Sequence, residues 1–528
     1  MKVFFITLLL MLSVSSTACA FEVQIDGLWY DLNPETKEAE VINCQDDNSY
    51  SGEISIPMSL KHQKTTYTIT GIGSMAFTDC RDLTSVVISN SVKSIGEYAF
   101  EGCTGLASVS LGNSIIRISH GAFKNCINLT TVTLDNNALV SQDRTLSTSL
   151  SNVFGRQVDT YIIGDDVTAI GEYTFAHCPK LTYATIGNSV MNIGAHAFEG
   201  CPKLSSLTIG KSVKDIGTSA FAGCYSLFSV NIPDSVERIH SFAFSLCANL
   251  SELSIGQSVK EIQKRAFSGC HKLSTVTINS NALVSQDRTA ATSLNILFST
   301  CDSIIKETSY SDIHSLAEKY GKDLVEKIVQ QYEVKTNRDQ LNFQRIFTLS
   351  TLQSEVKTYI IGDNVSHIGN NTFANSTKLT TVIMGNSVTR IGDGAFQGCS
   401  ALKSIDFSKY TTSIGAMAFS DCSDLSSVTI PDRVTFIGTS AFANCKSLIS
   451  VTLPYSLRNI NGIGYNVFEG CDKLKHIYSN IRNPFSVKED VFEYVYKAKL
   501  HVPAGTKKLY QSADGWKQFS KIVEFDAK

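Results

Sequence analysis

The stretch "IGEYAFEGCTGLASVSL", from Ile95 to Leu111, decides the fold because close copies of it recur along the 528-residue chain. Each copy has an isoleucine, a phenylalanine five residues later and, in all but one copy, a cysteine three residues after that. Thirteen copies of the isoleucine–phenylalanine pair are present, and within each block successive copies start 23 residues apart. A fixed period of this length is typical of solenoid proteins. We therefore expect stacked turns, and not the three or four globular domains that the length alone would predict.

The cysteine of the repeat raises the question of whether it is reactive or structural. Twelve of the fifteen cysteines occupy this one position, whereas a nucleophile or metal ligand is needed only once or a few times. The thirteenth copy has Ser376, which forms no disulfide. We interpret this cysteine ladder as buried free thiols that pack as small hydrophobic side chains. Pairing along the ladder remains an alternative, because turns stacked roughly 4.8 Å apart fall within the Cα separation that a disulfide accepts. The ladder consists of Cys80, Cys103, Cys126, Cys178, Cys201, Cys224, Cys247, Cys270, Cys399, Cys422, Cys445 and Cys471.

The two halves of the repeat predict two kinds of structure. The segment after each cysteine follows L-x-x-V-x-I, as in "LTSVVI" from Leu83 to Ile88, which predicts a strand with three aliphatic side chains inward. The other half, I-G-x-x-A-F, has glycine at ten of thirteen second positions and predicts a tight bend into a short helical or irregular turn. The predicted fold is a repeat solenoid, a leucine-rich-repeat horseshoe with a parallel β-sheet on one face, short turns on the other and about 13 rungs of 23 residues.

Two insertions interrupt the repeats, near residues 135–157 and 279–355. Both begin with "NALVSQDRT", at Asn137 and Asn281, which indicates a duplicated block. The second contains a predicted helical insertion, residues 299–346, which either packs on the solenoid or contacts a partner. The repeats span residues 70–480, between an N-terminal cap at 21–69 and a C-terminal cap at 481–528. Each cap holds one of the two tryptophans, Trp29 and Trp516, where an exposed end turn needs covering.

Residues 1–20 have the pattern of a secretory signal peptide. Lys2 precedes the apolar run "VFFITLLLML", and "ACA" at residues 18–20 fits a cleavage site after Ala20. Lipid attachment at Cys19 is the alternative. Both routes predict export, to a secreted or cell-surface location or to an outer-membrane lipoprotein, and no later segment predicts a transmembrane span.

Composition and motifs argue against several classes of function. The formal net charge is −3, so no excess of positive charge favours nucleic acid or acidic lipid. The sequence lacks H-E-x-x-H, G-x-S-x-G, P-loop and C-x-x-C motifs. The carboxylates of "GDD" at residues 164–166 are too few for calcium, which takes six to eight oxygen ligands. We therefore predict that the protein is not an enzyme and uses no cofactor or metal.

The residues that flank the central valine of each predicted strand form the strand face, the usual ligand surface of such repeats. Over the first twelve rungs, eighteen of these twenty-four residues are Ser or Thr. Small and β-branched hydroxyl residues also suit exposed strands that bind nothing. Because arginine and aromatic anchors are scarce, the expected contact is broad, weak and multivalent. Four departures from the hydroxyl pattern are the predicted ligand-facing residues: Tyr183, Asn231, Glu252 and Asp406.

The consensus I-G-x-x-A-F-x-x-C-x-x-L-x-x-V-x-I resembles the BspA-like, or Treponema-type, class of bacterial leucine-rich repeats. The ends "IDGLWYDLNPETKEAEVI" and "LHVPAGTKKLYQSADGWKQFSKIVE" resemble the terminal segments of that family. The resemblance implies an exported adhesin or surface scaffold whose partners are host matrix or plasma proteins, such as fibronectin and fibrinogen, or other bacteria. The alternative is a surface protein that captures glycans or nutrients.

Overall fold

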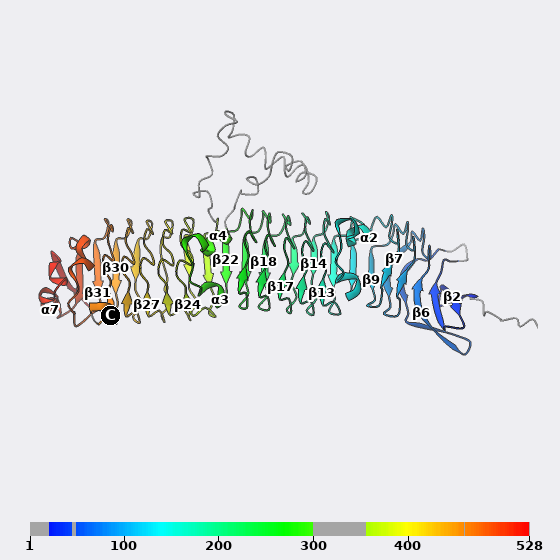
Figure 1. Cartoon of the computed structure of the whole chain (residues 1–528), viewed down its shortest axis with the longest axis horizontal. Coiled ribbons are helices and arrows are strands. Elements are labelled where there is room, and N and C mark those ends of the chain that lie inside the picture. Colours follow the sequence, from blue (N-terminus) through cyan, green and yellow to red (C-terminus); the bar gives the residue numbers. More distant parts are fainter. Residues whose placement is uncertain (1–20, 45–48, 299–354, 459, 527–528) are drawn as a thin grey trace, which may run out of the picture. The chain divides into compact units, whose positions relative to one another are not determined.

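A computed structural model of the chain describes residues 21–44, 49–298, 355–458 and 460–526. The predicted signal peptide with Cys19, and the predicted helix within 299–346, lie outside these residues. The chain divides into two compact units, Met1–Leu139 with Asn152–Gln157, and Val140–Ser151 with Val158–Lys528. Both units are built from solenoid turns (Figure 1), about 17 in total.

The first unit starts with a small antiparallel sheet and continues as parallel ladders. Strands β1 (Phe21–Ile25), β2 (Leu28–Asn33) and β3 (Glu38–Val41) are antiparallel, and β5 (Ser59–His62) forms a hairpin with β6 (Thr65–Ile72). One parallel ladder, which we call the second ladder, runs from β3 through β6 to β8 (Ser94–Ile95) and β10 (Arg117–Ile118). The other, which we call the first ladder, carries the strand face and consists of β4 (Gly52–Ile56), β7 (Leu83–Ile88), β9 (Ser108–Leu111) and β11 (Thr131–Leu134).

The second unit repeats the same pair of ladders. In this unit the first ladder continues the strand face. It consists of β12 (Thr160–Ile163), β14 (Tyr183–Thr185), β16 (Ser206–Thr208), β18 (Ser229–Ile232), β20 (Glu252–Ile255), β22 (Thr275–Ile278), β23 (Thr358–Ile361), β25 (Thr381–Ile383), β28 (Ser427–Thr429), β30 (Ser450–Leu453), β31 (His476–Ser479), β32 (Lys499–Pro503) and β33 (Lys521–Phe525). Its second ladder consists of β13 (Ala169–Ile170), β15 (Asn192–Ile193), β17 (Asp215–Ile216), β19 (Arg238–Ile239), β21 (Glu261–Ile262), β24 (His367–Ile368), β26 (Arg390–Ile391), β27 (Ser413–Ile414) and β29 (Phe436–Ile437).

The helices of the described residues lie in the interruptions and the C-terminal cap, apart from η5, which lies within the last repeat. They are α1 (Asn137–Val140), η1 (Leu146–Thr148), α2 (Leu150–Phe154), α3 (Asn281–Val284), η2 (Ala290–Thr292), α4 (Leu294–Leu297), η5 (Ile460–Gly462), η6 (Glu489–Val491), η7 (Glu493–Val495), α7 (Lys507–Ser512) and η8 (Trp516–Gln518). Each interruption is followed by a strand with the sequence TYII, β12 and β23. The turns that contain β4, β12, β23, β32 and β33 lack the I-G-x-x-A-F motif, which is why counting that motif gave about 13 turns.

The repeat glycine has a different role from the predicted tight bend. The isoleucine before it belongs to the second ladder, and a Cβ on Gly217 would lie only 2.7 Å from the backbone nitrogen of Ala195 in the preceding turn. Glycine therefore permits neighbouring backbones to approach closely.

The short loops that follow the second-ladder strands are hydrogen-bonded from one solenoid turn to the next. Tyr98 and Gly102 have positive φ angles of 56° and 74°, and these two positions repeat in the other turns. The N–H groups of Tyr98, Phe100 and Gly102 donate to carbonyls of the next turn at 3.2, 2.7 and 2.9 Å. The third side of each turn is thus a regular layer.

The repeated phenylalanines stack through the core. Phe77, Phe100 and Phe123 have ring centroids 4.8 and 5.0 Å apart, and Phe154 of the first interruption continues the stack 5.0 Å from Phe123. At the C-terminal end the buried Trp516 lies 4.8 Å from Phe492. At the N-terminal end the ring against Phe77 belongs to Tyr50, whose hydroxyl accepts a bond from the backbone N–H of Trp29. Trp516 thus closes the stack as expected, whereas Tyr50 takes the place expected for Trp29.

Candidate functional site

The cysteine ladder is part of the core. Every ladder cysteine is free and buried, as the sequence predicted. The thiol donates to the carbonyl of the phenylalanine in the preceding turn, at 3.3 Å from Cys201 to Phe175 and 3.4 Å from Cys224 to Phe198. Burial raises the pKa of Cys80 and of Cys399 to about 12. Because the thiolate is the nucleophile and the metal ligand, these side chains are suited to packing and not to chemistry.

The strand face lies exposed or half-buried along the first ladder. Its eighteen hydroxyl groups, all within the described residues, make no hydrogen bond to protein except a 3.4 Å contact between Thr381 and Thr380. By contrast, the hydroxyl one position earlier bonds to the previous turn in several repeats, for example from Thr182 to the Asp159 carbonyl at 3.1 Å. The face hydroxyls are therefore available to water or to a ligand.

The four predicted ligand-facing residues are all exposed on this face. Asn231 and Glu252 lie on adjacent strands, β18 and β20, where Asn231 pairs with Ser254 and Glu252 with Ser229. Tyr183 is 56% exposed on β14, which β16 separates from the strands of Asn231 and Glu252. Asp406 forms an isolated bridge with Ile383 of β25, and β22 and β23 lie between β20 and β25. The structure brings Asn231 and Glu252 together and leaves the other two apart.

Asp406 lines an open depression of about 710 Å³ that the sequence did not reveal. Lys409, Tyr410, Arg433 and Tyr455 share this lining. The Lys409 Nζ and the Arg433 guanidinium carbon lie 5.2 and 5.0 Å from the centroid of the Tyr410 ring. These residues follow the strands in three consecutive turns, so only an alignment of the loops would have found them.

A second aromatic cluster lies where the first ladder reaches the C-terminal cap. The His501 ring stacks on Tyr478 at 4.3 Å, and its Nε2 lies 3.1 Å from Nδ1 of His476. Burial, together with Lys499 and His476, lowers the pKa of His501. His476 and Tyr478 take the two face positions of the thirteenth rung, so the hydroxyl pattern of the first twelve rungs does not extend to them.

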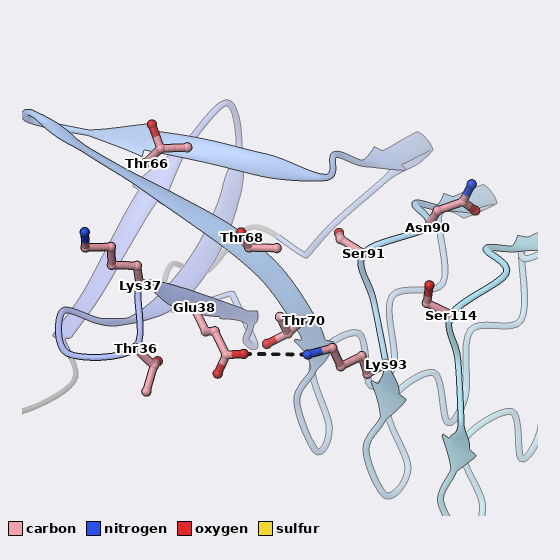
Figure 2. Close-up of a pocket in the computed structure, with 10 residues that line it drawn as sticks. All are labelled: Thr36, Lys37, Glu38, Thr66, Thr68, Thr70, Asn90, Ser91, Lys93 and Ser114. Atoms are coloured by element: carbon pink, nitrogen blue, oxygen red, sulfur yellow. Dashed lines mark ion pairs between the residues drawn. The ribbon is translucent and has the colours of Figure 1, made fainter.

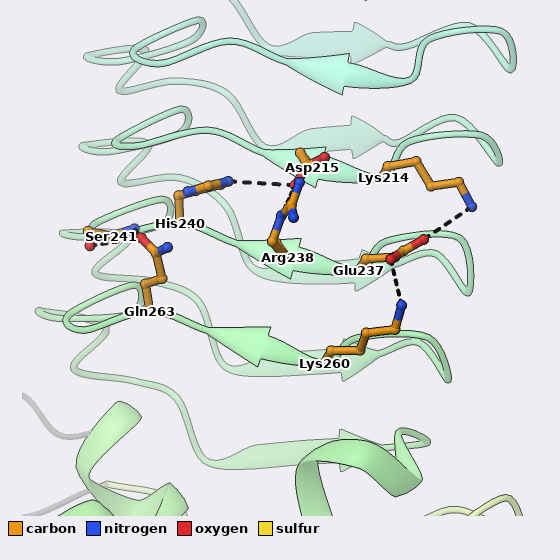
Figure 3. Close-up of polar contacts among 8 residues, drawn as sticks. All are labelled: Lys214, Asp215, Glu237, Arg238, His240, Ser241, Lys260 and Gln263. Carbon is orange, nitrogen blue, oxygen red and sulfur yellow. Dashed lines mark hydrogen bonds and ion pairs between the residues drawn. The ribbon is translucent and has the colours of Figure 1, made fainter.

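Several charged side chains at the second ladder are paired across neighbouring turns. Figure 3 shows Lys214, Glu237 and Lys260 on consecutive turns, with Nζ–carboxylate distances of 3.8 and 2.7 Å. Arg238 and His240 lie 2.6 and 3.6 Å from the same Asp215 carboxylate oxygen. The Lys260 ammonium lowers the pKa of Glu237. Such cross-turn pairs favour one stacking register.

An open depression of about 480 Å³ lies in the first unit, where the cap strands meet the second ladder. Figure 2 shows threonines of β6 along it, and Lys93 reaching to 3.8 Å from the Glu38 carboxylate. Its lining has hydroxyl, amide and charged groups without an aromatic ring.

Two further tests bear on the class of protein. In the described ranges no three His, Cys, Asp or Glu side chains gather so that they could hold a metal ion. Among the same residues no helix is both long enough and apolar enough to span a membrane.

Solved structures with similar chains include several bacterial repeat proteins. A leucine-rich repeat protein from Bacteroides ovatus is 21% identical over 87% of this chain and 94% of its own, with a TM-score of 0.29. A leucine rich cell surface protein from Faecalibacterium prausnitzii is 22% identical over the same shares, with a TM-score of 0.26. The pneumococcal vaccine antigen PcpA is 16% identical over 96% of this chain and all of its own, with a TM-score of 0.31. No curated protein matches the chain.

The family described as "BspA type Leucine rich repeat region (6 copies)" matches residues 58–165, 168–296 and 366–499. These ranges cover more than half of the sequence and contain the thirteen isoleucine–phenylalanine repeats, the twelve ladder cysteines and most strands of the two parallel ladders. The chain belongs to the BspA-type leucine-rich repeat family.

Proposed function

We propose that this protein is an exported adhesin or surface scaffold that binds other proteins, either host matrix and plasma proteins or components of other bacteria. The observation that carries the proposal is the strand face, where all hydroxyls but that of Thr381 lack a protein partner among the described residues, while neighbouring side chains bond between turns. Leucine-rich repeat solenoids are typically binding scaffolds, because stacked repeats create an extended surface without enclosing a reaction site. Export rests on the signal-peptide pattern of residues 1–20.

The composition of the face favours a broad contact. Hydroxyl groups offer a donor and an acceptor without the desolvation cost of a charge. Residues that dominate tight interfaces are sparse there, with Tyr183 the one aromatic residue among its first twelve rungs. Many weak contacts on parallel strands give useful affinity when the partner presents repeated segments.

The test is binding of residues 21–528 to immobilised fibronectin and fibrinogen, with serum albumin as the control surface. A parallel sample lacks residues 299–346, because that insertion is the other site that the sequence offers for a partner. We expect saturable binding to a matrix or plasma protein that survives the deletion. Binding that disappears with the insertion would move the site away from the strand face, and equal binding to albumin would refute the adhesin proposal.

A further inference from the structure

The loops that follow the first-ladder strands have a recurring polar pattern, which changes in three consecutive turns. In five turns the loop carries an Asn or Asp followed by a serine, as in Asn90–Ser91 and Asp234–Ser235. The side-chain oxygen accepts a bond from the backbone of the next turn, at 3.0 Å from Asn113 to Asn90 and 2.9 Å from Gln257 to Asp234. The pattern therefore links neighbouring loops.

The equivalent positions hold Lys409–Tyr410, Asp432–Arg433 and Tyr455–Ser456. Lys409 and Tyr455 hold the place of the small acceptor, as Lys211 and Gln257 do in earlier turns. Tyr410 and Arg433 stand where the other loops have Ser, Asn or Asp. Stacking does not require these residues, and a local rule broken without a structural gain points to function. All of them except Ser456 line the depression that also contains Asp406.

The side chains around the depression differ in whether they contact one another or are accessible to a ligand. Tyr455 is 55% exposed, and within the described residues its ring contacts no other aromatic or cationic group, so more than half of its side chain is accessible to a ligand. The Tyr410 ring instead lies beside Lys409 and Arg433 and holds those cations in place. No carboxylate within the described part of the chain forms an ion pair with Arg433, which leaves its guanidinium donors available.

From this arrangement we infer that the depression around Asp406, Arg433 and Tyr455 binds a neutral oligosaccharide. A sugar ring presents a face of C–H groups, which packs on an aromatic ring, and a rim of hydroxyls, which bond to carboxylates and guanidinium groups. The lining contains two carboxylates, Asp406 and Asp432, and two cations, Lys409 and Arg433, so its net charge is zero and favours neither an anion nor a cation. The volume of about 710 Å³ lies within the range of small-ligand sites, roughly 300–1,000 Å³.

The depression shares Ser404, Asp406 and Ser427 with the strand face, but its ligand is a soluble sugar and not a protein surface, so the two proposals are tested by different ligands. The experiment uses residues 21–528 and isothermal titration calorimetry with four neutral trisaccharides: maltotriose, cellotriose, mannotriose and N-acetylchitotriose. Sialyllactose serves as an acidic probe. We expect saturable binding of at least one neutral trisaccharide, weakened tenfold or more by Tyr455→Ala and by Arg433→Gln.

The matched control is Tyr183→Ala, which removes a tyrosine of similar exposure from another strand and leaves sugar binding unchanged. Circular dichroism establishes that each variant is folded. The inference is overturned by heat changes without saturation for all four neutral sugars, by preference for sialyllactose alone, or by binding that Tyr455→Ala leaves intact.

Discussion

At the residue scale, one position per repeat accounts for most of the cysteines, and its surroundings explain why a thiol is tolerated there. The side chain is buried, its S–H donates to a carbonyl of the preceding turn, and burial raises its pKa. The sequence predicted this assignment because the position recurs too often for a catalytic group. The thiol–carbonyl bond was not predictable, since it depends on the offset between stacked turns.

We expect the ladder thiols to be unreactive in the native protein. At pH 8 a group with a pKa of about 12, such as Cys80 or Cys399, is almost entirely protonated, and burial also denies access to the reagent. Labelling with Ellman's reagent, followed by alkylation and peptide mass spectrometry, should modify the ladder only in guanidinium chloride. Cys44, which is half-buried, provides the comparison within the same sample. Stoichiometric native labelling of the ladder would contradict this description of the core.

Substituting two serines distinguishes a structural hydroxyl group from a hydroxyl group of the strand face. Ser280 is fully buried, accepts a bond from the Leu283 N–H at 3.1 Å and donates to the Val259 carbonyl. Ser280→Ala should therefore lower the free energy of unfolding by about 1–3 kcal/mol, through a lost helix cap and an unsatisfied carbonyl.

Ser254 on β20 has no such partner, so Ser254→Ala should change the stability by less than about 0.5 kcal/mol. Guanidinium chloride titrations followed by circular dichroism measure both variants. A loss for Ser254→Ala as large as that for Ser280→Ala would mean that the face hydroxyls are structural.

At the element scale, the phenylalanine stack determines how strongly neighbouring turns cohere. Phe221 is fully buried between Phe198 and Phe244, with centroid distances of 5.2 and 5.1 Å. Phe221→Ala should lower the free energy of unfolding by about 3–5 kcal/mol. Phe228 lies in the same repeat but is 58% exposed, so Phe228→Ala is the matched control and should have little effect. Equal losses in chemical unfolding would show that the stack does not support the turns.

The β31–β32 pair should respond to acid. The folded-state pKa of His501 lies below its ordinary value of 6.5, so the unfolded chain takes up this proton first as the pH falls. The contribution of His501 to stability is present above about pH 6.5 and decreases as the pH falls through that value. Thermal unfolding from pH 7.5 to 5 should show this loss, and His501→Gln should reduce it. The exposed His271→Gln is the control, and an unchanged slope in His501→Gln would contradict the assignment.

The sequence predicted some elements well and others not at all, for physical reasons. Strands such as β7 followed from alternating burial of Leu83, Val86 and Ile88, a pattern that the residues themselves contain. The second ladder did not, because two-residue strands such as β8 show no alternation and exist only through bonds to turns 23 residues away. The depression around Tyr455 was missed for a similar reason, since its side chains meet only after three loops are stacked.

At the scale of the whole molecule, the surfaces that hold the turns together differ from the strand face. Ion pairs link several turns along the second ladder, thiols and phenylalanines fill the core, and the strand-face hydroxyls other than Thr381 have no protein partner among the described residues. The central claim is that this face contacts the partner protein.

The most direct test places charge on that face and measures binding to immobilised fibronectin and fibrinogen. Ser206→Lys with Ser229→Lys adds two cations on exposed positions of β16 and β18, whereas Met191→Lys with Asn192→Lys adds the same charge at the second ladder. The account predicts at least tenfold weaker binding for the first pair and unchanged binding for the second, because buried uncompensated charge disrupts only the surface that is in contact. Unchanged binding for the first pair, with both variants folded, would contradict it.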